Sequence, residues 1–202
     1  MPSNERMIID GKAVWPHLNE PDTFHSDDGT YQTGVSLPIT EAQPLIDKFT
    51  KFFDEGYKAL CDERKKASLK KYPGMPWVEE TDQDDKPTGN IIFKTKIPAK
   101  TAKGTEQRPI LVDSKGQPMT EVIGGGSKIK ASVAPYVWFN SSLGAGLRLT
   151  LRGVQVLELQ QGRASSASDC GFDVEEGFET TSAALATAEV DGDEDGEQGG
   201  DF

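Results

Sequence analysis

Two lysines and two aromatic residues fall on even-numbered positions within residues 124–138, GGGSKIKASVAPYVW. Side chains alternate between the two faces of a β-strand, so this stretch, predicted as one strand, has an apolar face and a second face of different chemistry. The second face carries Lys128, Lys130, Tyr136 and Trp138. Cations contact phosphates and exposed rings stack on bases, so the pattern favours a surface for single-stranded nucleic acid. An ordinary half-exposed strand, whose rings cover the end of a core, fits the same residues.

Two other segments predict strands with cations on one face. Residues 91–97, IIFKTKI, and residues 147–159, LRLTLRGVQVLEL, alternate between apolar side chains and polar or charged ones. Gly153 in the second segment is predicted to mark a β-bulge where the register changes. We expect the cations of all three segments to line the path of a nucleic-acid backbone: Lys94, Lys96, Lys128, Lys130, Arg148 and Arg152.

Two further tryptophans are candidates for the same surface. Trp15 ends a short apolar run at residues 12–18, next to a proline, where a ring serves either as part of the core or as a stacking platform. Trp77 falls within residues 75–90, MPWVEETDQDDKPTGN, which predict a loop. An exposed loop tryptophan is harder to assign to a core. Both rings are kept as candidates for the nucleic-acid surface.

The formal net charge of −11 is unevenly distributed along the chain. Residues 163–202 hold 12 acidic residues and one basic residue, whereas residues 1–162 hold 21 of each. Within residues 91–160 there are ten Lys or Arg against four Asp or Glu. The basic excess therefore falls on the segment that carries the candidate strands, as a phosphate-binding surface requires.

The C-terminal segment from Gln161 is rich in Gly, Ser, Ala, Asp and Glu and closes as DGDEDGEQGGDF. Such a composition buries too little apolar surface to fold alone, so residues 161–202 are predicted to be a disordered acidic tail. A tethered acidic tail could also occupy the basic strands as a mimic of nucleic acid. The residues expected to bind partners are Asp191, Asp193, Glu194, Asp195, Glu197, Asp201 and Phe202.

The remaining patterns predict a mainly β domain at residues 1–160. Residues 12–18 and 30–39 predict an N-terminal hairpin with a long connection. Residues 40–71 predict one long helix, with capping-box spacing between Thr40 and Gln43 and an apolar stripe. About five strands with glycines at bends and one helix after the second strand indicate a small closed barrel, with the five-stranded Greek-key OB-fold as its leading member.

Little in the sequence indicates an enzyme, a metal site or a membrane protein. The GGGSK run lacks the spacing of a phosphate-binding Walker loop, and the acidic residues form no recognisable catalytic pair. Cys61 and Cys170 lie far apart and there are only two histidines, so no metal or cofactor is expected. No apolar run reaches the length of a membrane span and no signal peptide is recognisable, so the protein is expected to be soluble and cytoplasmic.

The run LVDSKGQPMTEVIGGGSKIKASVAPYVWFNSSLGAGLRLTLRGVQVLEL, with an acidic tail ending in GDF, resembles the single-stranded DNA-binding proteins of short-tailed lytic bacteriophages of the gene 2.5 type. The resemblance is strong over residues 91–159 and looser in the N-terminal half. It implies an OB-fold barrel that coats single-stranded DNA in phage replication, recombination and repair. The matching DNA-binding positions are Lys128, Lys130, Tyr136 and Trp138.

The resemblance also implies that the tail recruits replisome proteins, a DNA polymerase and a helicase-primase, and that it is linked to homodimer formation. The host cell cytoplasm is the implied location. Two other functions fit the residues alone. One is an RNA-binding or chaperone barrel of the cold-shock type, which would use the same rings and lysines, and the other is an adaptor that acts through the tail only.

Overall fold

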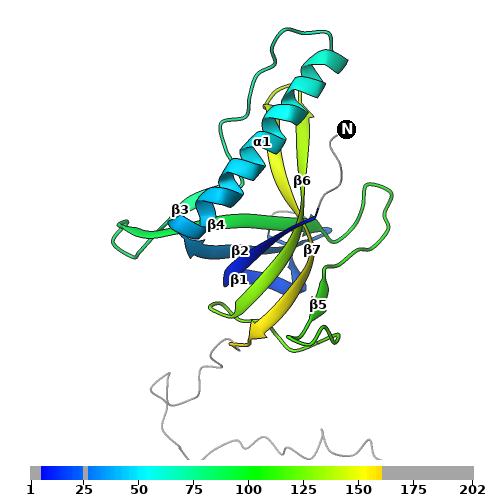
Figure 1. Cartoon of the computed structure of the whole chain (residues 1–202). Coiled ribbons are helices and arrows are strands. Elements are labelled where there is room, and N and C mark those ends of the chain that lie inside the picture. Colours follow the sequence, from blue (N-terminus) through cyan, green and yellow to red (C-terminus); the bar gives the residue numbers. More distant parts are fainter. Residues whose placement is uncertain (1–5, 25–26, 161–202) are drawn as a thin grey trace, which may run out of the picture. The chain divides into compact units, whose positions relative to one another are not determined.

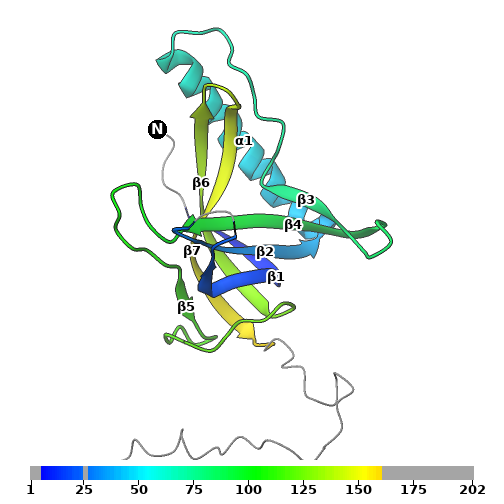
Figure 2. The same ribbon diagram turned by 180° about the vertical axis from the view of Figure 1, so that it is seen from behind.

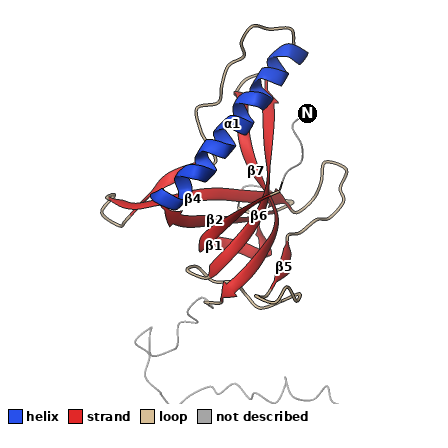
Figure 3. Cartoon of the chain, in the orientation of Figure 1, coloured by secondary structure: helices blue, strands red, loops and turns tan. Residues whose placement is uncertain are grey.

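The computed structural model describes residues 6–24 and 27–160, which contain seven strands and one helix. In chain order they are β1 (Met7–Asp22), β2 (Thr30–Pro38), α1 (Ile39–Glu63), β3 (Trp77–Thr81), β4 (Pro87–Pro98), β5 (Ile110–Val112), β6 (Lys128–Asn140) and β7 (Gly144–Glu158). Figure 3 shows that strands make up most of the regular secondary structure of the described residues. The predicted acidic tail lies outside the described residues, so the domain boundary at residue 160 stays a prediction.

Five of the strands close into a barrel (Figure 1). Antiparallel pairs join β4 to β2, β2 to β1, β1 to β6, and β6 to β7. A short parallel pairing of β4 with β7, in which Thr95 lies opposite Leu149, closes the ring. This is the strand order of an OB-fold, so the predicted fold is confirmed. The short strands β3 and β5 extend the sheet at β4 and β7 (Figure 2).

The period-two patterns of the sequence place the core correctly. Ile129, Ala131 and Val133 of β6 are fully buried. The partner strand β7 buries odd-numbered leucines up to Leu151 and even-numbered valines from Val154 onward. The change of phase is a β-bulge: Ser132 pairs with Gly153 and Val133 with Leu151, which leaves Arg152 as the extra residue. The bulge predicted at Gly153 is therefore confirmed.

The helix differs from its prediction at both ends. Pro38 occupies the N-cap position and no side chain caps the helix, so the predicted capping box at Thr40 is wrong. At the other end α1 stops at Glu63 rather than at Lys71, and Lys65 has a positive φ of 53°. The residues beyond Cys61 are mostly charged and offer no apolar stripe to pack, so only helix propensity favoured the longer helix. The Tyr57 hydroxyl holds the following segment by hydrogen bonds to the backbone of Leu69.

The apolar stripe of α1 covers two different surfaces. Near the barrel, Phe49 is fully buried and its ring centroid lies 5.8 Å from that of Phe93 and 6.3 Å from that of Trp77. Farther along, α1 follows the part of the β6–β7 hairpin that projects from the barrel (Figure 1). Gly56 makes this approach possible, because a Cβ there would collide with Val137. One face of the projecting hairpin is thus covered by the helix.

Several boundaries correct the predictions. The predicted strand at residues 124–138 begins only at Lys128, because residues 124–127 form a turn in which the Ser127 hydroxyl donates to the Gly124 carbonyl. The first strand is longer than predicted and is interrupted by bulges. Trp77 does not lie in a loop but begins β3, an edge strand too short and polar to stand out in the sequence.

A carboxylate ties β3 to the barrel. Glu80 accepts hydrogen bonds from Ser36 at 3.1 Å, Thr88 at 2.9 Å and Asn90 at 2.7 Å. Partial burial acts to raise the pKa of Glu80, but the hydrogen bonds from Asn90, Thr88 and Ser36, with the charge of Lys12, outweigh it and hold the pKa below its ordinary value.

Candidate nucleic-acid interface

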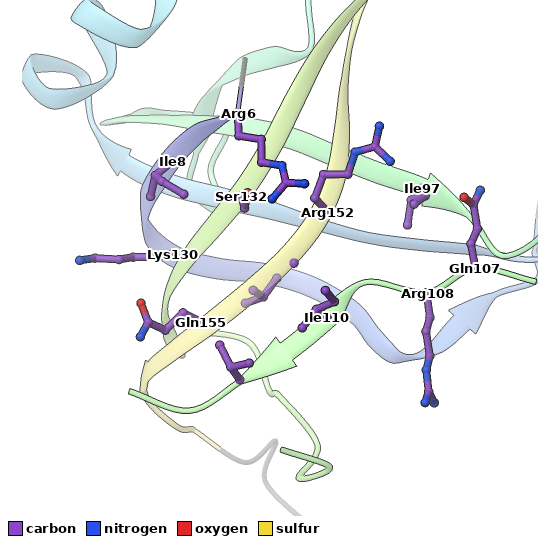
Figure 4. A pocket seen from close by; sticks show the side chains of 13 residues that line it. Arg6, Ile8, Ile97, Gln107, Arg108, Ile110, Lys130, Ser132, Arg152 and Gln155 are labelled. Atoms are coloured by element: carbon purple, nitrogen blue, oxygen red, sulfur yellow. The ribbon is translucent and has the colours of Figure 1, made fainter. Parts of the chain in front are cut away.

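Two adjoining recesses form one open groove along the outer face of β6 and β7. Their volumes are about 810 Å³ and 430 Å³, and both are lined by Ile97, Gln107 and Arg152. The larger recess is bounded by β5 and by the start of β1 (Figure 4). The smaller recess continues along β6 toward Tyr136. Because the two share side chains, a bound chain could pass from one to the other.

Every charged side chain that lines this groove is a cation. They are Arg6, Lys100, Arg108, Lys130, Arg148 and Arg152, and no Asp or Glu is among the lining residues. Figure 4 shows Arg6 and Lys130 on the side of β1 and β6, with Arg108 on the opposite side. Two of the lysines have acidic partners outside the lining, Lys130 with Asp10 at 3.9 Å and Lys100 with Asp28 at 3.0 Å. These exposed pairs are weak, so their lysines stay available for phosphates.

The Tyr136 ring combines exposure with a cation. Its side chain is 51% exposed, and the residue lies directly opposite Arg148 in the β6–β7 register. The Arg148 guanidinium lies 5.1 Å from the ring centroid, within cation–π range. The Arg148 Nε is buried and, among the described residues, makes no hydrogen bond. This nitrogen is therefore a donor without an acceptor at the edge of the groove, next to a ring on which a base can stack.

Trp138 follows Tyr136 on the same face of β6 and lies beyond the recesses. It pairs with Gly146 of β7, and a Cβ at that glycine would overlap the Trp138 ring. Its ring centroid lies 5.3 Å from that of Tyr72, at an interplanar angle of 55°. The expectation that Tyr136 and Trp138 share the outer face is thus met, but Trp138 is the more buried of the two.

The remaining predicted lysines lie around the groove rather than in it. Lys96 is exposed on β4 opposite Thr150, which lines the smaller recess, so Lys96 borders the groove. Lys94 is exposed on the same face, two residues earlier. Lys128 is exposed at the start of β6 opposite Lys12, outside both linings. Lys130, Arg148 and Arg152 are the predicted cations that line it.

The structure separates the two other tryptophans from this groove. Trp77 stacks on Phe49 and lies 6.0 Å from Phe93, so its partly buried ring packs against the core. Trp15 is 82% exposed at a bulge of β1, with an unusual positive φ of 44°, and lines neither recess. Neither ring lies with Tyr136. A role in binding DNA stays a prediction for Trp15, whereas the packing of Trp77 favours a structural role over the predicted one.

Arg6, Lys100 and Arg108 were not predicted as groove residues. They lie at the start of β1 and in the segment between β4 and β5, where no period-two pattern indicates a face. Arg6 is placed by the pairing of β1 with β6, and Lys100 and Arg108 belong to the segment that leads into β5 and its pairing with β7. The only signal in the sequence was the basic excess of residues 91–160, which includes two of the three.

The described residues contain no cluster of three or more His, Cys, Asp or Glu side chains arranged to hold a metal. None of the helices within them is both long and apolar enough to cross a membrane. Cys61 is buried. The tail residues named above lie outside the part of the chain that the structure describes.

Comparison with known protein families shows to which family this chain belongs. A family model described as single-stranded DNA-binding protein, bacteriophage T7, matches residues 13–159. The chain belongs to this family. The single-stranded DNA-binding protein of Enterobacteria phage T3 is 32% identical to this chain over 185 residues, an alignment that covers 81% of this chain and 77% of the T3 protein. The predicted family resemblance is confirmed.

Solved structures agree with this assignment to the T7-type family. The crystal structure of gp2.5, a single-stranded DNA-binding protein encoded by bacteriophage T7, matches 89% of this chain and all of its own, with a TM-score of 0.64 and 26% identity. The single-stranded DNA-binding protein of bacteriophage Enc34, solved in complex with single-stranded DNA, has a TM-score of 0.58 and 14% identity over 79% of this chain and 89% of its own. The second match shows a shared fold.

Proposed function

We propose that this phage protein binds single-stranded DNA in the groove along β6 and β7 with little preference for sequence. The observation that carries the proposal is a groove lined by cations and by no acidic residue, with the exposed Tyr136 ring at one end beside Arg148. Phosphates need the cations, and bases need a flat apolar surface. Both are present within one continuous groove.

The mechanism uses stacking for the bases and charge for the backbone. Tyr136 and Trp138 stack on bases, and each such contact is worth about 1 to 3 kcal/mol. Arg148, Arg152 and Lys130 contact phosphates. Every base has a π-face and every nucleotide has a phosphate, so neither contact selects a sequence. The protein can then coat and protect DNA of any sequence.

The acidic tail supplies the proposed contacts with other proteins. Asp191, Asp193, Glu194, Asp195, Glu197, Asp201 and Phe202 combine negative charge with a terminal ring. We infer that this segment recruits a DNA polymerase and a helicase-primase, takes part in homodimer formation, and competes with DNA for the basic groove. Its tether raises its effective concentration at the groove. These contacts would place the protein in phage replication, recombination and repair.

A salt series with a fluorescent thymidine oligomer tests the proposal. The full chain is compared with a chain that ends at Gln161, and the logarithm of affinity should fall linearly with the logarithm of salt concentration, by about 0.7 per contacted phosphate. Tighter binding by the shortened chain at low salt would support competition by the tail. Absence of binding by both chains would contradict the proposal and favour an adaptor, and preference for a ribose oligomer would favour an RNA-binding protein.

A further inference from the structure

The outer face of the projecting β6–β7 hairpin carries aromatic surface that begins in the groove at Tyr136 and continues beyond it. Tyr136 and Trp138 stand on this face two residues apart, which is about 6.6 Å along a strand. Opposite Trp138, Gly146 contributes no side chain, so the indole ring lies over bare backbone of β7. The other face of the hairpin is covered by α1, so only this outer face is open to a ligand (Figures 1 and 2).

A loop brings a second ring to Trp138. The Tyr72 amide donates to the Ala145 carbonyl at 2.7 Å, and the Ala145 amide donates to the Lys70 carbonyl at 2.8 Å. These two bonds place residues 70–72 as a short parallel strand along the free edge of β7, with Lys71 opposite Ala145. The backbone, not the tyrosine side chain, therefore fixes the position of Tyr72.

The alternation of side chains decides which way these residues point. Lys71 faces the helix, where its Nζ lies 4.5 Å from the Tyr57 ring centroid. Tyr72 and Lys70 consequently face the opposite side, the outer face that carries Trp138. Tyr72 contacts the Trp138 ring there and keeps 39% of its side chain exposed. The Lys70 Nζ donates one hydrogen bond, to the Ser142 carbonyl at 3.1 Å, and has two further donor hydrogens.

We propose that Trp138 and Tyr72 form a second binding subsite for an unpaired nucleobase, with Lys70 placed to contact the adjoining phosphate. The inference rests on the proposed function and extends it. A bound strand would run from Arg152 past Tyr136 and Arg148 to Trp138 and Tyr72. From Ser132, which lines the larger recess, to Trp138 this path follows about 20 Å of β6.

The test is a pair of double-mutant cycles on the full chain with a thymidine dodecamer. Tyr72→Ala alone should weaken binding about 5- to 10-fold, at the lower end of the range for loss of one stacking ring. Added to Tyr136→Ala, which acts at a separate ring, it should multiply the loss. Added to Trp138→Ala, which removes the other half of the same subsite, it should cost less than about 2-fold more.

Conservative and charge variants serve as matched controls. Tyr72→Phe keeps the ring and should bind within about 2-fold of the natural protein. Lys70→Ala should lower the slope of log affinity against log salt concentration by about 0.7. Lys66→Ala, an equal charge change at an exposed position of the same loop, should leave that slope unchanged.

Photocrosslinking of a dodecamer that contains bromodeoxyuridine gives a readout without any variant, and the expected crosslinks include Tyr72 or Trp138.

The outcomes separate this subsite from the proposed function. If Tyr136→Ala weakens binding while Tyr72→Ala does not, or if Tyr72 and Trp138 prove additive, the subsite is overturned and the groove stands. If Tyr72→Phe is as weak as Tyr72→Ala, stacking by the ring is overturned. If the natural protein does not bind the dodecamer at all, both inferences are overturned.

Discussion

Two groups of three aromatic rings in this protein each contain one tryptophan and lie in opposite surroundings. The first, Phe49, Trp77 and Phe93, is packed between α1, β3 and β4, with ring centroids 5.8 to 6.3 Å apart. The second, Tyr72, Tyr136 and Trp138, lies on the outer face of the β6–β7 hairpin. Arg148 lies against Tyr136 in the second group, and Lys70 is on the same face. A ring thus becomes a candidate base platform through its neighbours and exposure, not through its residue type.

The difference arises from which side of a strand each ring occupies. Phe93 shares its face of β4 with buried residues such as Thr95 and Ile97, so it points into the barrel. Tyr136 shares its face of β6 with Lys130 and Ser132, so it points outward. The first group should therefore control stability and the second should control binding.

Replacing Trp77 should have the largest effect. Trp77→Ala removes the contacts of a large, half-buried ring with Phe49 and Phe93, and we expect the free energy of unfolding to fall by about 3 kcal/mol. Chemical denaturation followed by circular dichroism measures this change. Affinity for a thymidine oligomer, measured where the variant is folded, should stay within about 2-fold of the natural protein.

A Trp77→Ala protein that is as stable as the natural one but binds DNA poorly would reverse the assignment of this ring. It would then belong to the interface despite its packing. Trp77→Phe serves as the control, since it keeps an aromatic ring against Phe49 and should recover part of the stability.

Replacing Tyr136 should produce the converse result. Tyr136→Ala removes an exposed stacking ring, and binding should weaken by about 1 to 3 kcal/mol, or about 5- to 150-fold in Kd. Its side chain is half exposed, so the free energy of unfolding should change by less than about 1 kcal/mol. Fluorescence anisotropy at fixed salt measures the affinity, and a large fall in the midpoint of thermal unfolding would indicate a structural ring instead.

The division between the two ring groups was only partly predictable from sequence. The outward position of Tyr136 and the inward position of the β4 and β7 apolar residues follow from alternation, a local property. The bulge at Gly153 was also visible locally, as a change of phase beside a glycine. The five-stranded barrel followed from counting such segments, and the structure confirms it.

What the sequence did not show depends on contacts between distant segments. Trp77 packs against the core because β3 pairs with β4. The five residues WVEET carry too weak a pattern to predict that strand. Tyr72 and Lys70 reach the outer face through backbone hydrogen bonds with Ala145, and no local sequence pattern predicts these bonds. Arg6 lines the groove because β1 pairs with β6, and Arg108 lines it because β5, which follows it, pairs with β7.

Removing a groove cation should have a smaller, salt-dependent effect. Arg152 is the extra residue of the β7 bulge and lines both recesses. Arg152→Ala should lower the slope of log affinity against log salt by about 0.7 and weaken binding most at low salt. Lys103→Ala is the matched control, because Lys103 is exposed in the segment after β4 and lines neither recess. Equal slopes for the two variants would mean that the groove is not the phosphate path.

The smallest expected effect is on the pH dependence of stability. It concerns Glu80 of β3, the strand that also carries Trp77. The pKa of Glu80 in the folded protein is held below its ordinary value, so the unfolded chain binds the proton more readily than the folded protein does. Glu80 therefore contributes stability above a pH of about 4.5, and this contribution is lost as the pH falls through the lower pKa of the folded state. Glu80→Gln should reduce that loss on acidification, whereas Glu79→Gln, an exposed neighbour on β3, should not. Unfolding in urea between pH 3 and 7 gives the comparison.

A pH dependence of stability that is identical in Glu80→Gln and the natural protein would mean that the hydrogen bonds from Asn90, Thr88 and Ser36 do not favour the charged carboxylate. If the division between the two ring groups is correct, Glu80→Gln should leave the affinity for DNA at pH 7 unchanged, because β3 lies on the side of the barrel where rings pack rather than bind.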